Sequence, residues 1–410
     1  MYRPPLDSEL WFEVEPYPLE EAPTLEALFA PEIRYYSDVD AIYDTEYHAL
    51  IFGVPRSGKT NLLLRIEKAF WDRGWLVIHR DDMDSFNWLK MLDVLPKAVI
   101  WVPKGCKAEI RGLPKAEIKV RPYDPDNLYH DVIEALGRAY RRAWRYHVIL
   151  FDSFLGPSYE TVGKIARFYT DFLLGLVAWA SQRPKRKKIP IMIGFDEIND
   201  LIPPRGKHLS EAHEALREVL VLVLRKVGKH KIKIFGTSHR VTQVAPDIRA
   251  MAHLMFFKTT PIHDAYDFLN KLLVWVDNET FFSILKRLRY LDPEIAFYVD
   301  YRGNYDFVKF SFLPEPSCEL ELKGTIAEPT RRKIFDEKDM AIMVMRLKGL
   351  SFREIAEHVG LSLNTVWQRW HKIKDNSRIA QALAGAGLPP LDKMYQEARK
   401  MLKKASSASS

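Results

Sequence analysis

Residues 53–60, with the sequence GVPRSGKT, place two glycines, a lysine and a threonine at a spacing suited to phosphate chemistry. The segment fits the pattern G-x-x-x-x-G-K-[ST] at every fixed position. Glycine lets the backbone curl so that successive N–H groups point at phosphate oxygens, while Lys59 can reach the β- and γ-phosphates. The Thr60 hydroxyl can ligate Mg²⁺. We therefore predict that ATP and Mg²⁺ bind here, and that the nucleotide contacts Gly53, Val54, Pro55, Arg56, Ser57, Gly58, Lys59, Thr60 and Asn61.

The segments on either side of this loop favour the same interpretation. Residues 49–52 form an apolar run typical of a buried strand, and residues 61–70 have helical spacing. A helix that begins near Lys59 would add the positive end of its dipole to the phosphate site. A chance match in front of an unrelated helix is the alternative, and the flanking pattern makes it the weaker one.

Hydrolysis of a nucleotide also needs a carboxylate for the Mg²⁺ shell and a base that orients the attacking water. The apolar run 191–195 ends in Asp196 and Glu197, at the carboxyl end of a predicted strand, where ligands bind in parallel sheets. We expect Asp196 to hold Mg²⁺ and Glu197 to polarise the water. Asp152 follows another apolar run and competes for the metal role, but Ser153 follows it instead of a second acid. Either carboxylate could instead cap a helix.

A third apolar run, residues 232–236, leads into a polar segment. A polar side chain at this position can sense the γ-phosphate, and His239 or Ser238 would fit that role. A loop group that only solvent satisfies is the alternative.

From about residue 46 onward, strand-like and helix-like segments alternate. This alternation predicts an α/β fold, with a mostly parallel sheet covered by helices on both faces. Strands are expected at 49–52, 75–79, 98–102, 148–152, 191–195, 232–236 and 254–257, and helices at 61–70, 127–144, 159–181 and 210–227. Residues 294–323 are expected to form a hairpin or edge addition with its turn at Gly303 and Asn304.

Residues 336–374 predict a small all-α unit of three helices. The first helix stops at Gly349, Ser351 and Glu354 form a capping box for the second, and Ser362 caps the third. The unit looks like a helix-turn-helix, similar to the DNA-binding domains of sigma factors and response regulators. In that geometry the third helix enters the major groove. The DNA contacts would come from Ser362, Asn364, Thr365, Gln368, Arg369, Lys372 and Lys374. A helical protein-binding or lid domain with the same core is the alternative.

Composition sets the wider limits. The 410 residues are 47% hydrophobic and 28% charged, as in soluble globular proteins, and the length suggests two or three domains. Cys106 and Cys318 are the only cysteines, which excludes a disulfide framework and a cysteine-rich zinc site. No signal peptide or membrane span is recognisable, so we expect a cytoplasmic protein. We divide the chain into an acidic, proline-rich arm (1–45), an ATPase domain (46–327), a helix-turn-helix domain (328–378), and a basic helix with a disordered tail (379–410).

Net charge points to a polyanionic partner. The chain carries +7, although its first 45 residues are strongly acidic, so the body and the C-terminal part are basic. The basic run 183–188 could touch a DNA backbone; a solvated loop is the more common role of such a run.

Together the motifs resemble the HerA/FtsK superfamily of DNA-pumping P-loop ATPases, whose fold is RecA-like. The resemblance covers roughly residues 46–265 and is carried by FDEINDLIPP (195–204), RKVGKHKIKIFGTSHR (225–240) and VAPDIRAMAHLMFFK (244–258). It implies a homo-oligomer, often a hexameric ring, with active sites between subunits and double-stranded DNA in the pore. It also implies an arginine that enters the neighbouring site, with Arg225 the first candidate and Arg240 the second. His239 stands where the family usually has glutamine.

The resemblance makes an ATP-driven motor the first functional hypothesis. Such a motor would move or package duplex DNA for a virus or plasmid, with the C-terminal unit loading it on DNA. A nucleotide-switched transcription regulator is the alternative from another class, and a replication-initiation ATPase shares traits of both.

Overall fold

The computed structural model describes most of the chain from residue 48 onward. The described residues are 48–81, 85–155, 159–184, 188–202, 211–227, 230–324, 326, 337–374 and 389–407. The expected acidic arm, residues 185–187 of the basic run and the last three residues lie outside them.

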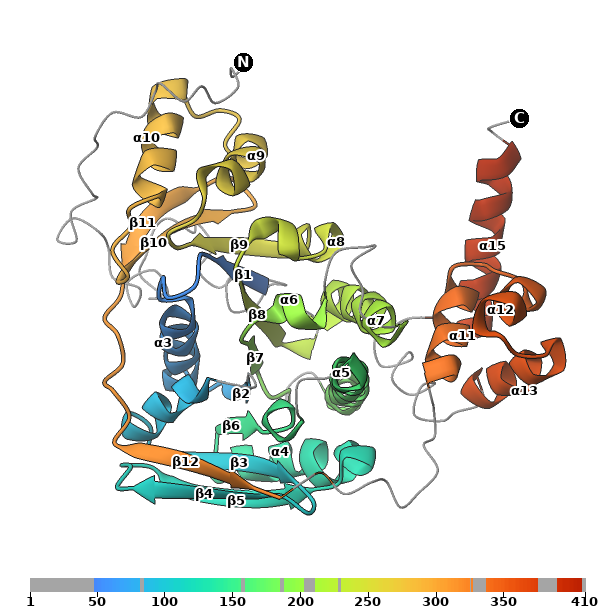
Figure 1. Ribbon diagram of the computed structural model, residues 1–410, viewed down its shortest axis with the longest axis horizontal. Helices are drawn as coiled ribbons and strands as arrows, with labels where there is room; N and C mark the ends of the chain where they lie inside the picture. The colour runs from blue at the N-terminus through green and yellow to red at the C-terminus, as the bar shows by residue number, and fades with distance from the viewer. Residues whose placement is uncertain are drawn as a thin grey trace.

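A ten-stranded sheet forms the centre of the protein (Figure 1). Its strand order is β11-β10-β9-β1-β8-β7-β2-β6-β3-β5. The strands are β1 (His48–Phe52), β2 (Leu76–Arg80), β3 (Lys97–Pro103), β5 (Glu117–Tyr123), β6 (Tyr146–Ile149), β7 (Ile191–Phe195), β8 (Ile232–Ser238), β9 (Ala252–Phe257), β10 (Ile295–Asp300) and β11 (Tyr305–Lys309). Neighbours from β9 to β5 pair in parallel, whereas β10 runs antiparallel to β9 and β11. The carboxyl ends of β1, β7 and β8 therefore meet at one edge of the sheet.

Helices cover both faces of this sheet, as Figure 1 shows. One face packs on α3 (Lys59–Asp72) and η3 (Phe86–Asp93). The other face packs on α4 (Glu134–Tyr140), α5 (Tyr159–Ser181), α6 (Ile198–Leu201), α7 (Glu211–Val227) and α8 (Pro246–Arg249). Because successive strand residues point to opposite faces, Ala49 and Ile51 join one apolar cluster and Leu50 and Phe52 the other. Strands buried on both faces read as continuous apolar runs, which is why the pattern was legible. The predicted fold class is confirmed: the protein is α/β, with a mostly parallel sheet that helices cover on both faces.

Two predicted elements differ from the structure. The helix expected over 127–144 is a short π-helical turn, η5 (Tyr129–Ile133), followed by α4. The strand expected over 148–152 is β6, which ends at Ile149, and Asp152 begins the 3₁₀ turn η6 (Asp152–Phe154).

Three strands lacked a clear sequence signal. β4 (Lys107–Gly112) and β12 (Cys318–Lys323) form a separate antiparallel ribbon, and β5 is an exposed edge strand. Their sequences alternate charged and apolar residues, and Lys and Glu are depleted in strands generally. Cross-strand ion pairs support the ribbon, including Lys323 to Glu109 at 2.9 Å. The hairpin expected over 294–323 is confirmed for β10 and β11, whereas β12 belongs to the separate ribbon. Gly303 lies in the hairpin turn with φ +82°, and the Trp275 ring packs against it.

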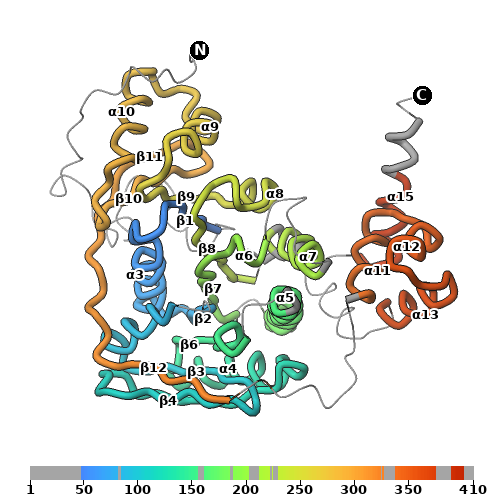
Figure 2. The backbone as a smooth tube through the Cα atoms, viewed as in Figure 1, coloured from blue at the N-terminus to red at the C-terminus, as the bar shows by residue number. Residues whose placement is uncertain are grey.

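The C-terminal unit has its own apolar core. It contains α11 (Glu337–Leu347), α12 (Phe352–Val359), α13 (Leu363–Lys374) and α15 (Leu391–Ser407). The Ser351–Glu354 capping box is present, and Gly360 ends α12 with φ +62°. Ala215 of α7 joins the same core, so α11 and α7 lie side by side (Figure 2). None of the described helices is long and apolar enough to span a bilayer.

Candidate nucleotide-binding site

The loop between β1 and α3 needs glycine at both fixed positions. A Cβ at Gly53 would lie 2.6 Å from Ser57 Oγ and 2.6 Å from Lys258 Cβ. Gly58 has φ +93°, and a Cβ there would lie 2.7 Å from the carbonyl oxygen of Pro293. Side-chain atoms crowd Gly53 and a main-chain oxygen crowds Gly58, so neither position has room for a side chain.

Neighbouring strands hold the loop in place. The Gly53 N–H donates to the Ser238 carbonyl at 3.2 Å, and the Val54 N–H donates to the Thr259 carbonyl at 2.8 Å. Pro55 and Arg56 form the exposed tip, Ser57 is buried, and Asn61 is half-buried in the first turn of α3. The predicted contact residues thus form one continuous cradle at the carboxyl edge of the sheet.

Lys59 is directed toward the ends of β7 and β8. Its Nζ lies 3.0 Å from His239 Nδ1, 3.3 Å from the Val54 carbonyl oxygen and 3.7 Å from Glu197 Oε1. Burial lowers the pKa of Lys59, and the charges of Glu197 and Asp196 oppose that shift. The site therefore gathers a cation and its acceptors from three segments distant in sequence.

His239 is suited to connect Lys59 with Glu197. Burial first, and then the charge of Lys59, lower the pKa of His239, which favours the neutral imidazole. Nδ1 then accepts from Lys59, and the Nε2 proton faces Glu197 Oε1 at 3.4 Å.

Asp196 and Thr60 place a carboxylate beside a hydroxyl. Thr60 Oγ1 donates to Asp196 Oδ2 at 2.9 Å, and Thr237 Oγ1 donates to Asp196 Oδ1 at 2.6 Å. Mg²⁺ prefers a few protein oxygens and takes its remaining ligands from phosphates and water. The adjacent oxygens of Thr60 and Asp196 fit such an ion.

Glu197 has an unusual backbone. Its φ is +50° and ψ +59°, in the left-handed region, where a non-glycine residue costs roughly 1–3 kcal/mol. Its N–H donates to Thr237 Oγ1 at 2.8 Å, so one hydroxyl connects both members of the acidic pair. The side chain is largely buried and directed toward Lys59 and His239.

Asp152, the competitor for the metal role, has a different partner. It is fully buried, and its Oδ2 accepts from Arg80 Nε at 2.8 Å. Arg80 and Thr237 are site residues that sequence reasoning missed. The only local signal was that each stands at or near the carboxyl end of an apolar run.

The two arginine candidates differ in what the structure describes. Arg240 is exposed, and its Nε lies 3.6 Å from Asp264 Oδ2 of α9 (Ile262–Leu272). Arg225 belongs to α7, and its side chain lies outside the described part of the chain.

The candidate DNA contacts lie on α13. Asn364, Gln368 and Lys372 are exposed and share one face of the helix at i, i+4 and i+8. Ser362 is exposed and its Oγ accepts from the Thr365 N–H at 3.1 Å, as a helix cap does. Trp367, also exposed on α13, lies against His371.

Arg369 and Lys374 have partners within the unit. Arg369 Nη1 donates to Asp339 Oδ1 of α11 at 3.1 Å, and Lys374 Nζ lies 3.4 Å from Asp392 Oδ2 of α15. Arg369 is therefore turned toward α11 instead of extending freely from the predicted recognition face.

Comparisons with known proteins give only distant likenesses. No family model and no curated protein matches this chain. The genome packaging NTPase B204 from Sulfolobus turreted icosahedral virus 2, solved with ATPγS, is 11% identical with a TM-score of 0.39, over 65% of this chain and 98% of its own. B204 from Sulfolobus turreted icosahedral virus, titled a DNA-packaging ATPase, is 13% identical with a TM-score of 0.38, over 65% and 99%. The bacterial conjugative coupling protein TrwB is 10% identical with a TM-score of 0.40, over 70% and 88%. Likenesses this distant transfer no residue role to this chain.

Proposed function

We propose that this protein is an ATPase that hydrolyses ATP with Mg²⁺ at the carboxyl edge of its sheet. One observation carries the proposal: Lys59, Thr60, Asp196, Glu197 and His239 come from three separated segments and meet there within hydrogen-bond or ion-pair distance. A structural ion-pair cluster would not require the glycine cradle beside it. The cradle and the cluster together match the parts that phosphoryl transfer needs.

The roles follow from the chemistry of each group. The loop N–H groups and Lys59 bind the phosphates, Thr60 and Asp196 hold Mg²⁺, and Glu197 orients the attacking water. A γ-phosphate would compete with Glu197 and His239 for the Lys59 ammonium, since all three are acceptors. Nucleotide binding would thus release Glu197 toward water and leave His239 to sense the phosphate.

We further infer a motor of the HerA/FtsK type that moves or packages double-stranded DNA. The support is the order of the three sequence blocks around the acidic pair and the basic balance of the chain. A homo-oligomeric ring, hexameric in the family, would bring Arg225 or Arg240 of one subunit to the γ-phosphate in the next.

The C-terminal unit is proposed to bind DNA through the exposed face of α13. Asn364 and Gln368 carry amides that can read base edges, and Lys372 can neutralise a phosphate. Arg369 is better assigned to holding α13 on α11, because it pairs with Asp339.

The junction between the units favours communication between DNA and ATP sites. Lys348, directly after α11, pairs with Glu214 of α7, and the imidazole of His213, also in α7, donates to the Asp200 carbonyl at 3.1 Å. The Asp200 N–H donates in turn to the Glu197 carbonyl. The same junction supports the second candidate, a nucleotide-switched transcription regulator in which nothing is pumped.

Steady-state ATP hydrolysis with and without non-specific duplex DNA, run beside light scattering for mass, separates these functions. A motor gives hydrolysis that DNA of any sequence stimulates several-fold, in a ring-sized assembly. Slow, DNA-indifferent hydrolysis by a monomer or dimer supports the regulator. A protein that neither binds nor hydrolyses ATP defeats both.

A matched pair of lysine variants tests the role of α13. Lys372→Ala should weaken DNA binding and lower its salt dependence, because one phosphate contact is lost, while DNA-free hydrolysis stays the same. Lys400→Ala, at an exposed lysine of α15, is the control and should leave affinity unchanged. Equal affinity in both variants would count against α13 as the DNA-binding helix.

A further inference from the structure

Arg80 contacts the main chain of Asp196 and Glu197, the acidic pair at the end of β7. It is the last residue of β2, which pairs with β7 so that Arg80 lies opposite Phe195, just before Asp196. Its Nη1 donates to the main-chain carbonyl of Asp196 at 2.6 Å and lies 3.3 Å from that of Glu197. One guanidinium therefore holds two successive carbonyl groups at the point where β7 ends.

Asp152 fixes the orientation of that guanidinium. Its Oδ2 lies 2.8 Å from Arg80 Nε and 2.5 Å from Nη2, and both side chains are buried. The planar fork of arginine can serve a carboxylate on one side and carbonyl groups on another, which a lysine cannot do. Asp152 thus acts through Arg80, and this accounts for a carboxylate that the nucleotide site itself does not use.

The turn is held from two directions. Thr237 Oγ1 bonds the Glu197 N–H and the Asp196 carboxylate, while Arg80 bonds the two carbonyls. Glu197 has a left-handed backbone, a conformation that persists only where surrounding contacts enforce it. A buried ion pair alone would be weak evidence of any role beyond packing. The contacts with the two carbonyls are what distinguish this pair.

We propose that Arg80, oriented by Asp152, is a positioning residue that fixes the 196–197 turn so that Asp196 meets Mg²⁺ and Glu197 meets the attacking water. The proposal rests on the ATPase function inferred above. It assigns Arg80 no contact with the nucleotide.

The double variant Arg80→Met/Asp152→Leu tests positioning apart from stability. Each single variant leaves an uncompensated buried charge and should destabilise the protein, whereas the double variant puts two apolar groups where the pair was. We expect the double variant to regain much of the melting temperature that each single variant loses, short of the cost of the two carbonyls left without their donor, and to bind Mg²⁺-free ADP with an affinity close to wild type. We expect kcat per nucleotide-binding subunit to stay about 10²-fold low, since a misplacement of about 1 Å can cost that much. The gain in ADP affinity on adding Mg²⁺ should also shrink several-fold.

Arg217→Met is the matched control. Arg217 is as buried as Arg80, but its ion-pair partners are Glu214, Glu218 and Asp247. This variant should lose stability while kcat per binding-competent subunit and the Mg²⁺ effect stay at wild-type values.

The outcomes separate two kinds of failure. If the wild-type protein hydrolyses ATP and the double variant has the same kcat and the same Mg²⁺ dependence, the positioning role alone is overturned. A wild-type protein that does not bind nucleotide would overturn the proposed function and this inference with it. If the double variant does not fold, Arg80→Lys keeps a charge beside Asp152 but cannot hold both carbonyls. It should show the same fall in kcat, and a normal kcat would overturn the proposal.

Discussion

Polar groups lie near both ends of β1, but they have different kinds of hydrogen-bond partner. At the carboxyl end, Lys59, Glu197 and His239 bond to one another through their side chains, next to a left-handed backbone. At the amino end, His48 accepts from the Ile234 N–H at 3.1 Å and donates to the Leu224 carbonyl at 3.3 Å.

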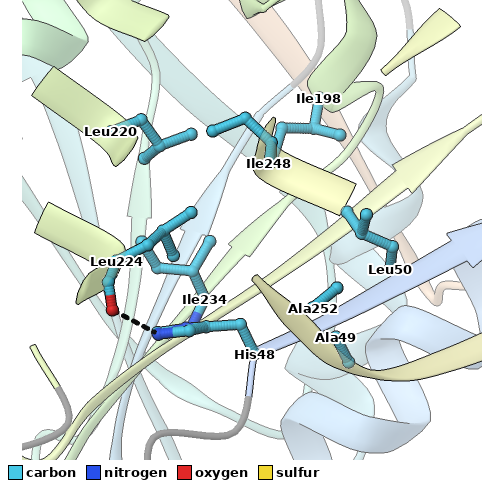
Figure 3. Close-up of a pocket in the computed structure, with 9 residues that line it drawn as sticks. All are labelled: His48, Ala49, Leu50, Ile198, Leu220, Leu224, Ile234, Ile248 and Ala252. Atoms are coloured by element: carbon cyan, nitrogen blue, oxygen red, sulfur yellow. Dashed lines mark hydrogen bonds between the residues drawn. The ribbon is translucent and has the colours of Figure 1, made fainter. Parts of the chain in front are cut away.

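Burial affects the histidine at each end, yet only one of them has partners that can change. Burial lowers the pKa of His48 to about 3, and a small cavity with mostly apolar walls lies beside it (Figure 3). The main-chain partners of His48 belong to a strand and a helix and cannot leave without unfolding. Two partners of His239, Lys59 and Glu197, are side chains that a phosphate could replace. A lowered pKa therefore shows only that a histidine is buried. We infer a functional role for His239 and a structural role for His48 from the kind of partner that each one has.

Lys59→Ala should have the largest effect. Loss of the ammonium removes phosphate affinity and transition-state charge stabilisation together, so we expect kcat/KM to fall by about 10⁴-fold or more. Nucleotide binding by calorimetry and phosphate release measure the two parts. Lys68→Ala, on the same helix in an ion pair with Asp72, is the control and should bind normally. Near-normal ATP hydrolysis by Lys59→Ala would contradict the assignment of the nucleotide site to this end of the sheet.

Glu197→Gln should separate binding from chemistry. The amide keeps the shape but cannot act as a base, so kcat should fall by about 10²–10⁴-fold while ATP affinity is kept. Single-turnover phosphate release in preformed complexes gives the comparison. Undiminished release would place the base elsewhere.

His239→Gln should change the pH dependence of catalysis. Protonation of His239 removes an acceptor for Lys59 in the nucleotide-free site and places a second positive charge beside its ammonium, so wild-type kcat/KM should fall as pH falls. Because the pKa of His239 is lowered, that loss should lie below the usual histidine value of about 6.5. The variant should lack this acid limb and lose about tenfold in kcat, the equivalent of one hydrogen bond to a charged group. The pH profile of kcat/KM, which reports the free enzyme, is the measurement, and an identical acid limb in the variant would exclude His239.

His48→Leu should have the smallest effect on catalysis. It leaves two buried main-chain groups without the imidazole, so unfolding free energy should fall by about 2–4 kcal/mol while kcat is unchanged. His48 has a folded-state pKa of about 3, below its unfolded value, so its contribution is complete above pH 6.5 and is lost as pH falls toward 3.

Urea unfolding of wild type and variant from pH 7 to pH 4 measures that slope. The variant should show a shallower fall, with a remainder from His147, whose pKa burial lowers to about 4. Parallel slopes in the two proteins would contradict the assignment of His48, and a lower kcat would erase the distinction between the two strand ends.

Much of this architecture could be predicted from the sequence, because it depends on residues that are close together in the chain. The strands buried on both faces are apolar runs, and the phosphate loop is defined by spacing within eight residues. Arg80 and Thr237 could not be identified in that way, since their roles depend on β2 and β8 lying beside β7. Arg369 was expected to face DNA because of its position on the helix, but its ion pair is with Asp339, thirty residues away in sequence. The charged ribbon of β4 and β12 could not be predicted from the sequence, because its stability comes from the pairing of the two strands and not from strand propensity.

Displacement of a triplex-forming oligonucleotide from duplex DNA is the decisive test of the proposed motor, because it reports movement along DNA rather than ATP turnover alone. We expect ATP-dependent displacement by the wild-type protein, and none with a non-hydrolysable ATP analogue or with Glu197→Gln. ATP hydrolysis at a normal rate without displacement of the third strand would contradict a motor and favour a nucleotide-switched regulator.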